Sequence, residues 1–258
     1  MAEFTEKSVV IHDDAPTLAR AVAARFLHRV AKRADQGKIV HVALTGGTIG
    51  TAVLHAIGEN PSHDDIDWSL VHFWWGDDRF VPRDSDDRNE KAARVAVLDA
   101  LTVPEENIHR MAASGEGIDL DEAADAYAAE LKRFGSADEA WPSFDVCFLG
   151  VGPDGHIASL FPDRREIDVC DRAVVSVRNS PKPPSERLSL TRPVINSSKR
   201  VWMVLSGHDK ASALGLALAG ASYNSVPAAG AKGRKRTILF VDEAAAENVP
   251  EELIDGEY

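Results

Sequence analysis

Stretches typical of β-strands alternate with stretches typical of amphipathic helices along this chain, and this order restricts the folds it can adopt. Residues 38–44 form a β-branched run, whereas residues 15–34 place Leu18, Val22 and Phe26 four apart, on one helix face. Parallel strands need long crossover connections, which helices supply. We therefore predict an α/β fold, a three-layer sandwich with a mostly parallel central sheet flanked by helices on both faces.

The same patterns predict where the individual elements lie. Strands are expected at residues 8–12, 38–44, 69–75, 144–149, 173–177, 201–205 and 237–241. Helices are expected at residues 15–34, from Thr48 through Ile57, and at residues 89–101, 120–134 and 210–218. Because no internal repeat or low-complexity linker divides the sequence, we predict a single domain over residues 1–258, with an acidic C-terminal tail from about residue 242.

The charge balance narrows the range of partners. Lys and Arg total 29 and Asp and Glu total 41, for a formal net charge of −12. Nucleic-acid backbones and anionic membranes are gripped by clustered cations, so we predict neither partner. The tail from Asp242 to Tyr258 carries seven of the acids and is expected on the surface. A small anionic ligand fits the composition, because a pocket can be locally basic on an acidic protein.

Three further features favour a cytoplasmic protein. No apolar run approaches the ~18 residues that a membrane span requires. Residues 1–11 lack the basic and apolar regions of a secretory signal. The two cysteines, Cys147 and Cys170, form no CxxC pattern, so we expect reduced thiols and no metal site. Cys147 is expected in a buried strand.

Three conspicuous loops follow predicted strands, at residues 45–50, 76–89 and 150–161. In open α/β sheets, ligands bind beyond the carboxyl ends of the strands, where loops lead into helices. We therefore expect these three loops to converge on one edge of the sheet.

The first loop contains Gly46-Gly47-Thr48. Paired glycines allow the backbone to approach a ligand closely, and the N-terminus of the following helix offers free amides to a phosphate. No lysine follows the glycines, so this is not a Walker loop. A tight strand-to-helix turn without a ligand is the alternative, and the motif by itself does not decide between the two.

The second loop places Asp77, Asp78 and Arg79 directly after an apolar strand. An arginine can hold a phosphate or a carboxylate with two hydrogen bonds, and the acids can position the arginine or a substrate hydroxyl. The alternative is a solvated loop in which the two acids only pair with Arg79.

The third loop, Gly150-Val151-Gly152-Pro153-Asp154-Gly155-His156, holds a histidine in a rigid turn beyond a strand end. Imidazole exchanges protons near neutral pH, so His156 is a candidate general base. The loop also matches the dinucleotide pattern G-x-G-x-x-G. We disfavour that interpretation because the match lies deep in the chain and Pro153 removes an amide. A structural or merely exposed histidine is the other alternative.

Basic side chains also occur in two segments of the second half. Prolines stiffen residues 180–191, which carry Lys182 and Arg187, and Lys210 lies near the start of a predicted helix. All three cations are candidates for holding an anion. A lysine at a helix start opposes the helix dipole, which favours a ligand role for Lys210. The alternatives are a proline-rich surface connector or docking segment, and an ordinary surface charge.

In their order along the chain, these motifs resemble those of the 6-phosphogluconolactonase family, within the wider glucosamine-6-phosphate isomerase/deaminase-like group of sugar-phosphate enzymes. The resemblance extends from about residue 8 to residue 241, and rests on residues 44–48, 75–82, 144–162, 180–191 and 207–211. Residues 150–162 are its most specific part. The proline-rich segment that ends at Arg187 distinguishes lactonases from deaminases.

The resemblance implies hydrolysis of 6-phospho-D-glucono-1,5-lactone to 6-phospho-D-gluconate in the oxidative pentose phosphate pathway, with no metal or organic cofactor. His156 would be the general base that activates water, and Asp154 would orient it. The amides of the first loop, with Arg187 and Lys210, would hold the phosphate. Arg79 and Lys182 would line the rim or stabilise charge on the lactone. The substrate- and phosphate-binding residues implied are Gly46, Gly47, Thr48, Asp77, Arg79, Lys182, Arg187 and Lys210.

Three other functions stay open at this point. A glucosamine-6-phosphate deaminase would use the same sheet and phosphate loop. A non-catalytic sugar-phosphate sensor would need a DNA-binding module, which we do not expect in the few residues before Ser8 or from any basic patch. A nicotinamide-dependent dehydrogenase would bind NAD(P) through residues 150–155. We expect a small-molecule partner, and either a monomer or a homodimer.

Overall fold

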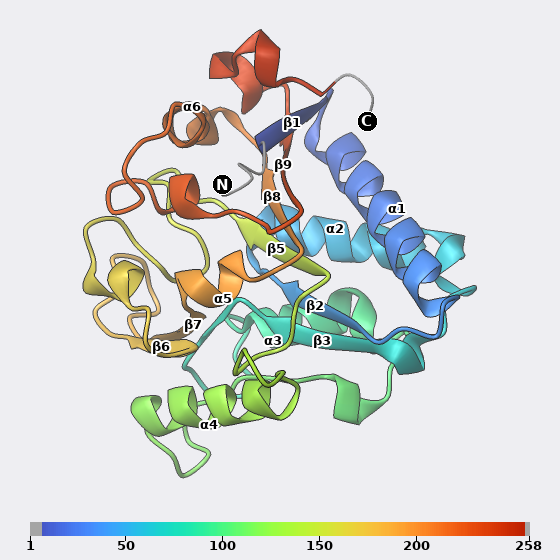
Figure 1. Ribbon diagram of the computed structural model, residues 1–258, viewed down its shortest axis with the longest axis vertical. Helices are drawn as coiled ribbons and strands as arrows, with labels where there is room; N and C mark the ends of the chain where they lie inside the picture. The colour runs from blue at the N-terminus through green and yellow to red at the C-terminus, as the bar shows by residue number, and fades with distance from the viewer. Residues whose placement is uncertain (1–6, 256–258) are drawn as a thin grey trace.

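The computed structural model describes residues 7–255 and has a six-stranded sheet at its centre (Figure 1). Its strands in spatial order are β1 (Lys7–His12), β9 (Arg236–Asp242), β8 (Arg200–Leu205), β5 (Val146–Gly150), β2 (Val40–Leu44) and β3 (Val71–Trp75). Every neighbouring pair is parallel. The carboxyl ends of all six strands therefore lie along the same edge of the sheet.

Helices cover both faces of this sheet, which confirms the predicted three-layer sandwich. Figure 1 shows α1 and α2 on one side of the sheet, with α5 and α6 on the other. The α-helices of the described residues are α1 (Ala15–Ala34), α2 (Gly47–Glu59), α3 (Asn89–Ala93), α4 (Leu120–Arg133), α5 (Arg192–Asn196) and α6 (Ala211–Leu218).

Local sequence signals explain the longest helix, α1. Asp14 caps it by accepting a hydrogen bond from the Thr17 amide at 2.8 Å. Leu18, Val22 and Phe26, which are four residues apart, are all buried on the face that packs against the sheet and α2. The apolar spacing in the sequence therefore gives both the helix and the direction of its buried face.

A second, antiparallel sheet lies outside the central one, and the sequence patterns do not predict it. Its strands in spatial order are β4 (Asp77–Arg79), β7 (Arg187–Leu190) and β6 (Val174–Val177). The stretch 173–177, expected among the strands of the parallel sheet, thus pairs with β7 instead. β4 and β7 are only three and four residues long and lie in segments with the composition of loops.

The helix expected at residues 89–101 is shorter and less regular than predicted. α3 ends at Ala93 and continues as a π-helical turn over Arg94–Leu98. Val97 and Leu98 in this turn are both buried. Packing into the core thus accompanies the departure from regular α-helical geometry.

The core contains large aromatic side chains from the central strands, and Trp74, Trp75 and Trp202 are fully buried. Cys147 is buried in β5, as expected, and Cys170 is exposed. Within residues 7–255, no helix combines the length and the hydropathy needed to cross a membrane.

The acidic segment from residue 242 begins inside the fold and then runs mostly over the surface, as expected, with Glu243, Glu247, Glu251 and Glu252 exposed. Asp242 is the last residue of β9 and is 5% exposed. Its carboxylate accepts hydrogen bonds from Ser206 Oγ at 2.5 Å and from the Gly207 amide at 3.0 Å. Further along, Ile254 forms a bridge with Val9 of β1. Residues 256–258 of the predicted tail lie outside the described residues.

Candidate active site

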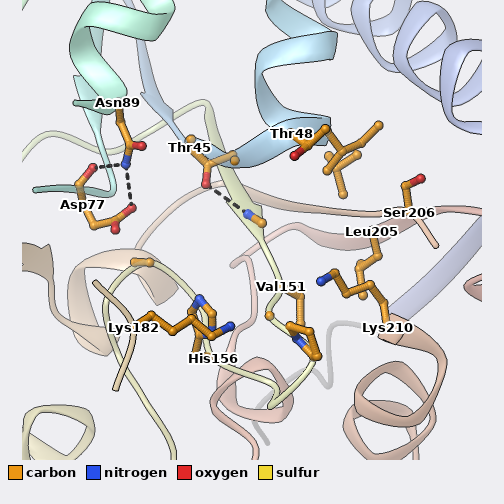
Figure 2. Close-up of a pocket in the computed structure, with 18 of the residues that line it drawn as sticks. Thr45, Thr48, Asp77, Asn89, Val151, His156, Lys182, Leu205, Ser206 and Lys210 are labelled. Carbon is orange, nitrogen blue, oxygen red and sulfur yellow. Dashed lines mark hydrogen bonds between the residues drawn. The ribbon is translucent and has the colours of Figure 1, made fainter. Parts of the chain in front are cut away.

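A cavity of about 590 Å³ opens at the edge of the central sheet where the strands have their carboxyl ends. The loops after β2, β3 and β5 meet there, together with the segment after β8 and the proline-rich segment before β7 (Figure 2). Asp154 lies beside His156, just outside the cavity lining. The other predicted site residues line the cavity, namely Gly46, Gly47, Thr48, Asp77, Arg79, His156, Lys182, Arg187 and Lys210.

The first loop presents the N-terminus of α2 to the cavity. Gly46 occupies the cap position, and among residues 7–255 no side chain caps the helix. Gly47 has φ +81°, in the left-handed region that glycine adopts easily. A Cβ on Gly46 would lie 1.9 Å from Asn89 Oδ1, so only glycine allows the second loop to approach this closely. Open amides and the exposed Thr48 form a surface suited to an anion.

His156 is oriented by Asp154, which lies two residues earlier in the third loop. His156 Nδ1 is 2.5 Å from Asp154 Oδ1. An ionised carboxylate can only accept a hydrogen bond, so Nδ1 carries the proton and Nε2 is left as the basic nitrogen. A Cβ on Gly152 would lie 2.0 Å from His156 Nδ1, so this glycine makes room for the pair. The Phe161 ring packs against the imidazole, with the ring centroids 4.6 Å apart.

Nearby positive charge keeps the Asp154 carboxylate ionised. Burial by itself would raise the pKa of Asp154, but the hydrogen bond from His156 and the charges of His156 and Lys182 hold that pKa well below its usual range. Lys182 Nζ lies 3.6 Å from Asp154 Oδ1 and 3.5 Å from His156 Nδ1. The ionised Asp154 therefore fixes the tautomer of the neutral His156 ring.

Lys210 reaches toward the cavity from the side opposite Lys182 (Figure 2). It immediately precedes α6, as the sequence predicts. Its Nζ lies 2.8 Å from Asp209 Oδ2, and the Asp209 side chain is 60% exposed. Because an ion pair with so exposed a partner contributes little energy, an incoming anion can replace Asp209 at low cost.

Arg187 contacts the protein more extensively than a residue that only binds a ligand. Its Nε donates to the Pro184 carbonyl at 3.0 Å, and Nη2 donates to the carbonyls of Lys182 at 3.0 Å and Pro183 at 2.9 Å. Burial, with the charge of Arg79 nearby, lowers the pKa of the Arg187 guanidinium. Among the described residues, none accepts from Nη1, which is thus the donor left for a ligand. Arg187 therefore also holds the segment that carries Lys182.

The adjacent carboxylates of the second loop have different surroundings. Asp78 is 1% exposed, accepts from the Asn89 amide at 2.7 Å and pairs with Arg88 at 3.0 Å. Burial raises the pKa of Asp78 to about 6, although the charge of Arg88 opposes the shift. Asp78 thus caps α3 and lies outside the cavity lining, whereas Asp77 is part of it.

Arg79 lies between the main cavity and an adjoining hollow of about 400 Å³, and it lines both. Its Nη1 donates to the Asp87 carbonyl at 2.7 Å, while its buried Nε has no acceptor among the described residues. Since Asp78 pairs with Arg88, the arrangement differs from a loop in which both acids pair with Arg79.

Two residues that the sequence analysis missed orient Asp77. Asn89 Nδ2 donates to the Asp77 carbonyl at 3.0 Å and to its Oδ1 at 3.4 Å (Figure 2). Ser159 Oγ donates to Asp77 Oδ2 at 2.7 Å. Ser159 lies three residues after His156, within residues 150–162, the most specific part of the family resemblance. This position is the one sequence signal that indicated a role for Ser159. Asn89 stands at the start of a predicted helix, where nothing in the sequence marks it.

Within the part of the chain that the structure describes, no group of three or more His, Cys, Asp or Glu residues is placed to hold a metal ion. An oriented imidazole faces a cavity lined by lysines, arginines and a helix N-terminus. These features are those of an α/β enzyme whose site is suited to acid–base chemistry on a small anionic ligand.

Comparison with known proteins places the chain more narrowly. It belongs to the family of glucosamine-6-phosphate isomerases/6-phosphogluconolactonase, whose model matches residues 13–240. A 6-phosphogluconolactonase of Streptomyces coelicolor is 43% identical over 249 residues, which are 95% of each chain. The crystal structure of 6-phosphogluconolactonase from Thermotoga maritima is 25% identical and has a TM-score of 0.80, over 92% of this chain and 100% of that one. A monomeric glucosamine-6-phosphate deaminase, 16% identical with a TM-score of 0.77 over 93% of this chain and 99% of that one, shares the fold.

Proposed function

We propose that this protein is a 6-phosphogluconolactonase, which hydrolyses 6-phospho-D-glucono-1,5-lactone to 6-phospho-D-gluconate in the oxidative pentose phosphate pathway. The observation that carries the proposal is the His156–Asp154 pair at a cavity whose other walls supply cations and free amides. The high identity to a lactonase over nearly the whole chain supports the same substrate.

The reaction needs one group that acts first as a base and then as an acid, and His156 serves in both roles. His156 Nε2 removes a proton from water while the water oxygen bonds to C1 of the lactone. The tetrahedral intermediate then collapses, and the bond between C1 and the ring oxygen breaks. The imidazolium returns its proton to that oxygen, and the new carboxylic acid ionises to solvent. Asp154 stabilises the imidazolium in between.

Negative charge develops on the carbonyl oxygen of the lactone during the attack. Lys182 and Arg79 both line the cavity that His156 faces, and their positive charges are suited to stabilise this oxygen. A lactone is an activated ester, so an oriented water and charge stabilisation suffice without a covalent nucleophile.

The phosphate of the substrate is assigned to the N-terminus of α2. The open amides of Gly46, Gly47 and Thr48 offer hydrogen bonds and the positive end of the helix dipole. Lys210 and Arg187 Nη1 supply positive charge and further donors. A phosphate held there leaves the lactone end of the substrate to His156.

The geometry of the third loop weighs against a nicotinamide-dependent dehydrogenase. The Gly152 amide donates to the His156 carbonyl and the Gly155 amide to the Gly152 carbonyl, each at 2.9 Å. Amides that a pyrophosphate would need are therefore engaged within the loop. A deaminase shares the fold, but the Arg187-supported segment that carries Lys182 favours the lactonase.

The proposal extends to the setting of the enzyme. We place it in the cytoplasm, acting on a freely diffusing sugar phosphate and not on a nucleic acid or a membrane. It acts as a monomer or a homodimer, and light scattering on the purified protein will distinguish the two.

Two parallel assays test the proposed function. Lactone freshly generated from glucose 6-phosphate should be hydrolysed well above its spontaneous rate at neutral pH, and glucosamine 6-phosphate should release no ammonia. Ammonia release without lactone hydrolysis would replace the lactonase by a deaminase. Binding of 6-phosphogluconate with neither activity would identify a sugar-phosphate sensor.

A further inference from the structure

The carboxylate of Asp77 is buried in the cavity wall, and its side-chain hydrogen bonds come from neutral donors. Asp77 is 5% exposed, with Ser159 Oγ 2.7 Å from Oδ2 and Asn89 Nδ2 3.4 Å from Oδ1. Among residues 7–255, no lysine or arginine forms an ion pair with it. Arg187, which lines the same cavity, interacts with this carboxylate through its charge and not through a hydrogen bond. A buried carboxylate that is hydrogen-bonded only to neutral donors in a ligand cavity indicates a role toward the ligand.

This carboxylate also joins the three loops that form the cavity. Ser159 belongs to the third loop, Asp77 and Asn89 belong to the second, and Asn89 packs directly against Gly46 of the first. The position of Asp77 is therefore linked both to the loop that carries His156 and to the proposed phosphate site.

The direction of the Ser159 hydroxyl is fixed by its own surroundings. Ser159 is fully buried, and its amide donates to Ser189 Oγ at 3.2 Å. Ser189 lies opposite Asp77 in the pairing of β4 with β7, and its hydroxyl donates to the Leu190 carbonyl at 3.0 Å. Backbone pairing and two buried hydroxyls thus aim Ser159 at Asp77 Oδ2 before any substrate binds.

We propose that Ser159 is a positioning residue for substrate recognition: it holds Asp77 Oδ2 so that Oδ1 accepts a hydrogen bond from a ring hydroxyl of the lactone. The bond from Asn89 to Oδ1 is long, at 3.4 Å, and leaves that oxygen able to accept a second donor. This inference rests on the proposed function, because the hydroxyl belongs to the proposed substrate.

A consequence follows for the alignment of the substrate. Ser159 lies three residues after His156 in one loop, so the group that orients Asp77 and the proposed base move together. A hydroxyl bound to Asp77 would hold the ring so that C1 faces His156. Loss of the Ser159 hydroxyl should therefore affect kcat as well as KM, and should do so through Asp77.

The test compares kcat/KM for the lactone and for its 2-deoxy, 3-deoxy and 4-deoxy analogues. For the wild-type chain, kcat/KM should be about tenfold to a hundredfold lower for the analogue that lacks the recognised hydroxyl than for the lactone. This is the range for one hydrogen bond to a charged group. Ser159→Ala should lose a similar factor on the lactone itself and should no longer distinguish that analogue. In an Asp77→Ala background, Ser159→Ala should have almost no further effect.

Controls separate this role from a structural one. Ser198→Ala removes a hydroxyl that is equally buried near the amino end of β8, and should keep full activity and discrimination. Ser159→Cys keeps the size of the side chain. If Ser159→Ala folds poorly, Ser159→Cys takes its place in the test and should show the same loss of activity and discrimination.

The outcomes also separate this inference from the proposed function. Hydrolysis by the wild-type chain with unchanged discrimination in Ser159→Ala and Ser159→Cys would overturn only the positioning role. Additive effects of the Asp77 and Ser159 substitutions would do the same. A wild-type chain that does not hydrolyse the lactone would overturn both.

Discussion

At the scale of single residues, the proposed mechanism depends on the proton that His156 accepts. Because Asp154 holds Nδ1, replacement of the ring removes the only base that the proposed mechanism contains. We expect His156→Ala to lower kcat at least ~10²-fold, measured by hydrolysis above the spontaneous rate. His28→Ala, which changes an exposed histidine of α1, is the matched control and should keep wild-type activity. Near-wild-type turnover in His156→Ala would remove His156 from the mechanism.

Lys210 is the sharper probe of the phosphate assignment. Its neighbouring carboxylate, Asp209, is exposed, so Lys210→Ala should leave the fold intact and raise KM by about tenfold with little change in kcat. Inhibition by inorganic phosphate should weaken by a similar factor. Arg187→Ala should instead change kcat as well, because Arg187 also supports the segment of Lys182. An unchanged KM in Lys210→Ala would contradict the assignment.

Residue types and spacing went far toward predicting this site, because loops that follow parallel strands must meet at one edge. They did not separate Asp77 from Asp78. That difference depends on how β4 pairs with β7, which turns Asp77 toward the cavity wall and Asp78 toward Arg88. Ser159 escaped prediction for a similar reason, since its partner lies 82 positions away in the sequence.

At the scale of elements, the proposed phosphate site at the N-terminus of α2 depends on the second loop packing against it. Gly46→Ala would place a Cβ 1.9 Å from Asn89 Oδ1, so Asn89 must move and its bonds to Asp77 must loosen. We expect kcat/KM to fall on the order of 10²-fold, as for other displacements of about 1 Å near an active site. Circular dichroism will verify that the variant is folded.

The matched control for that substitution lies on the same helix. A Cβ on Gly58 would meet its nearest neighbour at 3.5 Å, an ordinary contact. Gly58→Ala should therefore keep full activity, and alanine is the better helix former. Equal activities of Gly46→Ala and Gly58→Ala would refute the packing argument.

Element length explains which parts of the fold could be predicted. α1 has 20 residues with regular apolar spacing, and the strands of the parallel sheet are predominantly apolar runs. β7 spans four residues, all buried, and its alternation of polar and apolar residues from Arg187 to Leu190 is too short to identify a strand. The second sheet is therefore defined by tertiary pairing, which local sequence does not encode.

At the scale of the whole molecule, a cluster of buried and partly buried histidines lies near the amino ends of β2 and β3, away from the cavity. His41 of β2 lies opposite His72 of β3, and His72 Nδ1 is 2.9 Å from His109 Nε2. Burial, with repulsion from His72, His109 and Lys199, lowers the pKa of His41 to about 3. Burial also lowers the pKa of His109 to about 4, although Glu130 opposes the shift. The folded protein therefore resists protonation here.

This resistance predicts how stability depends on pH. Unfolded histidines take up a proton near pH 6.5. Below that pH the unfolded state binds more protons than the folded state, so the free energy of unfolding decreases as the pH falls toward 4. Each buried histidine contributes a slope of at most ~1.4 kcal/mol per pH unit. Urea unfolding at pH 7, 6 and 5, followed by tryptophan fluorescence, will measure the total slope.

Substitution assigns this slope to the cluster. His41→Gln keeps an acceptor for the Trp74 indole, which donates to His41 Nδ1 at 3.1 Å, but removes the titrating group. Its unfolding free energy should fall less steeply between pH 7 and 5 than that of the wild-type chain, because carboxylates contribute equally to both. His28→Gln, at an exposed position, should keep the wild-type slope. If His41→Gln and the wild-type chain have the same slope, the acid sensitivity arises outside this cluster.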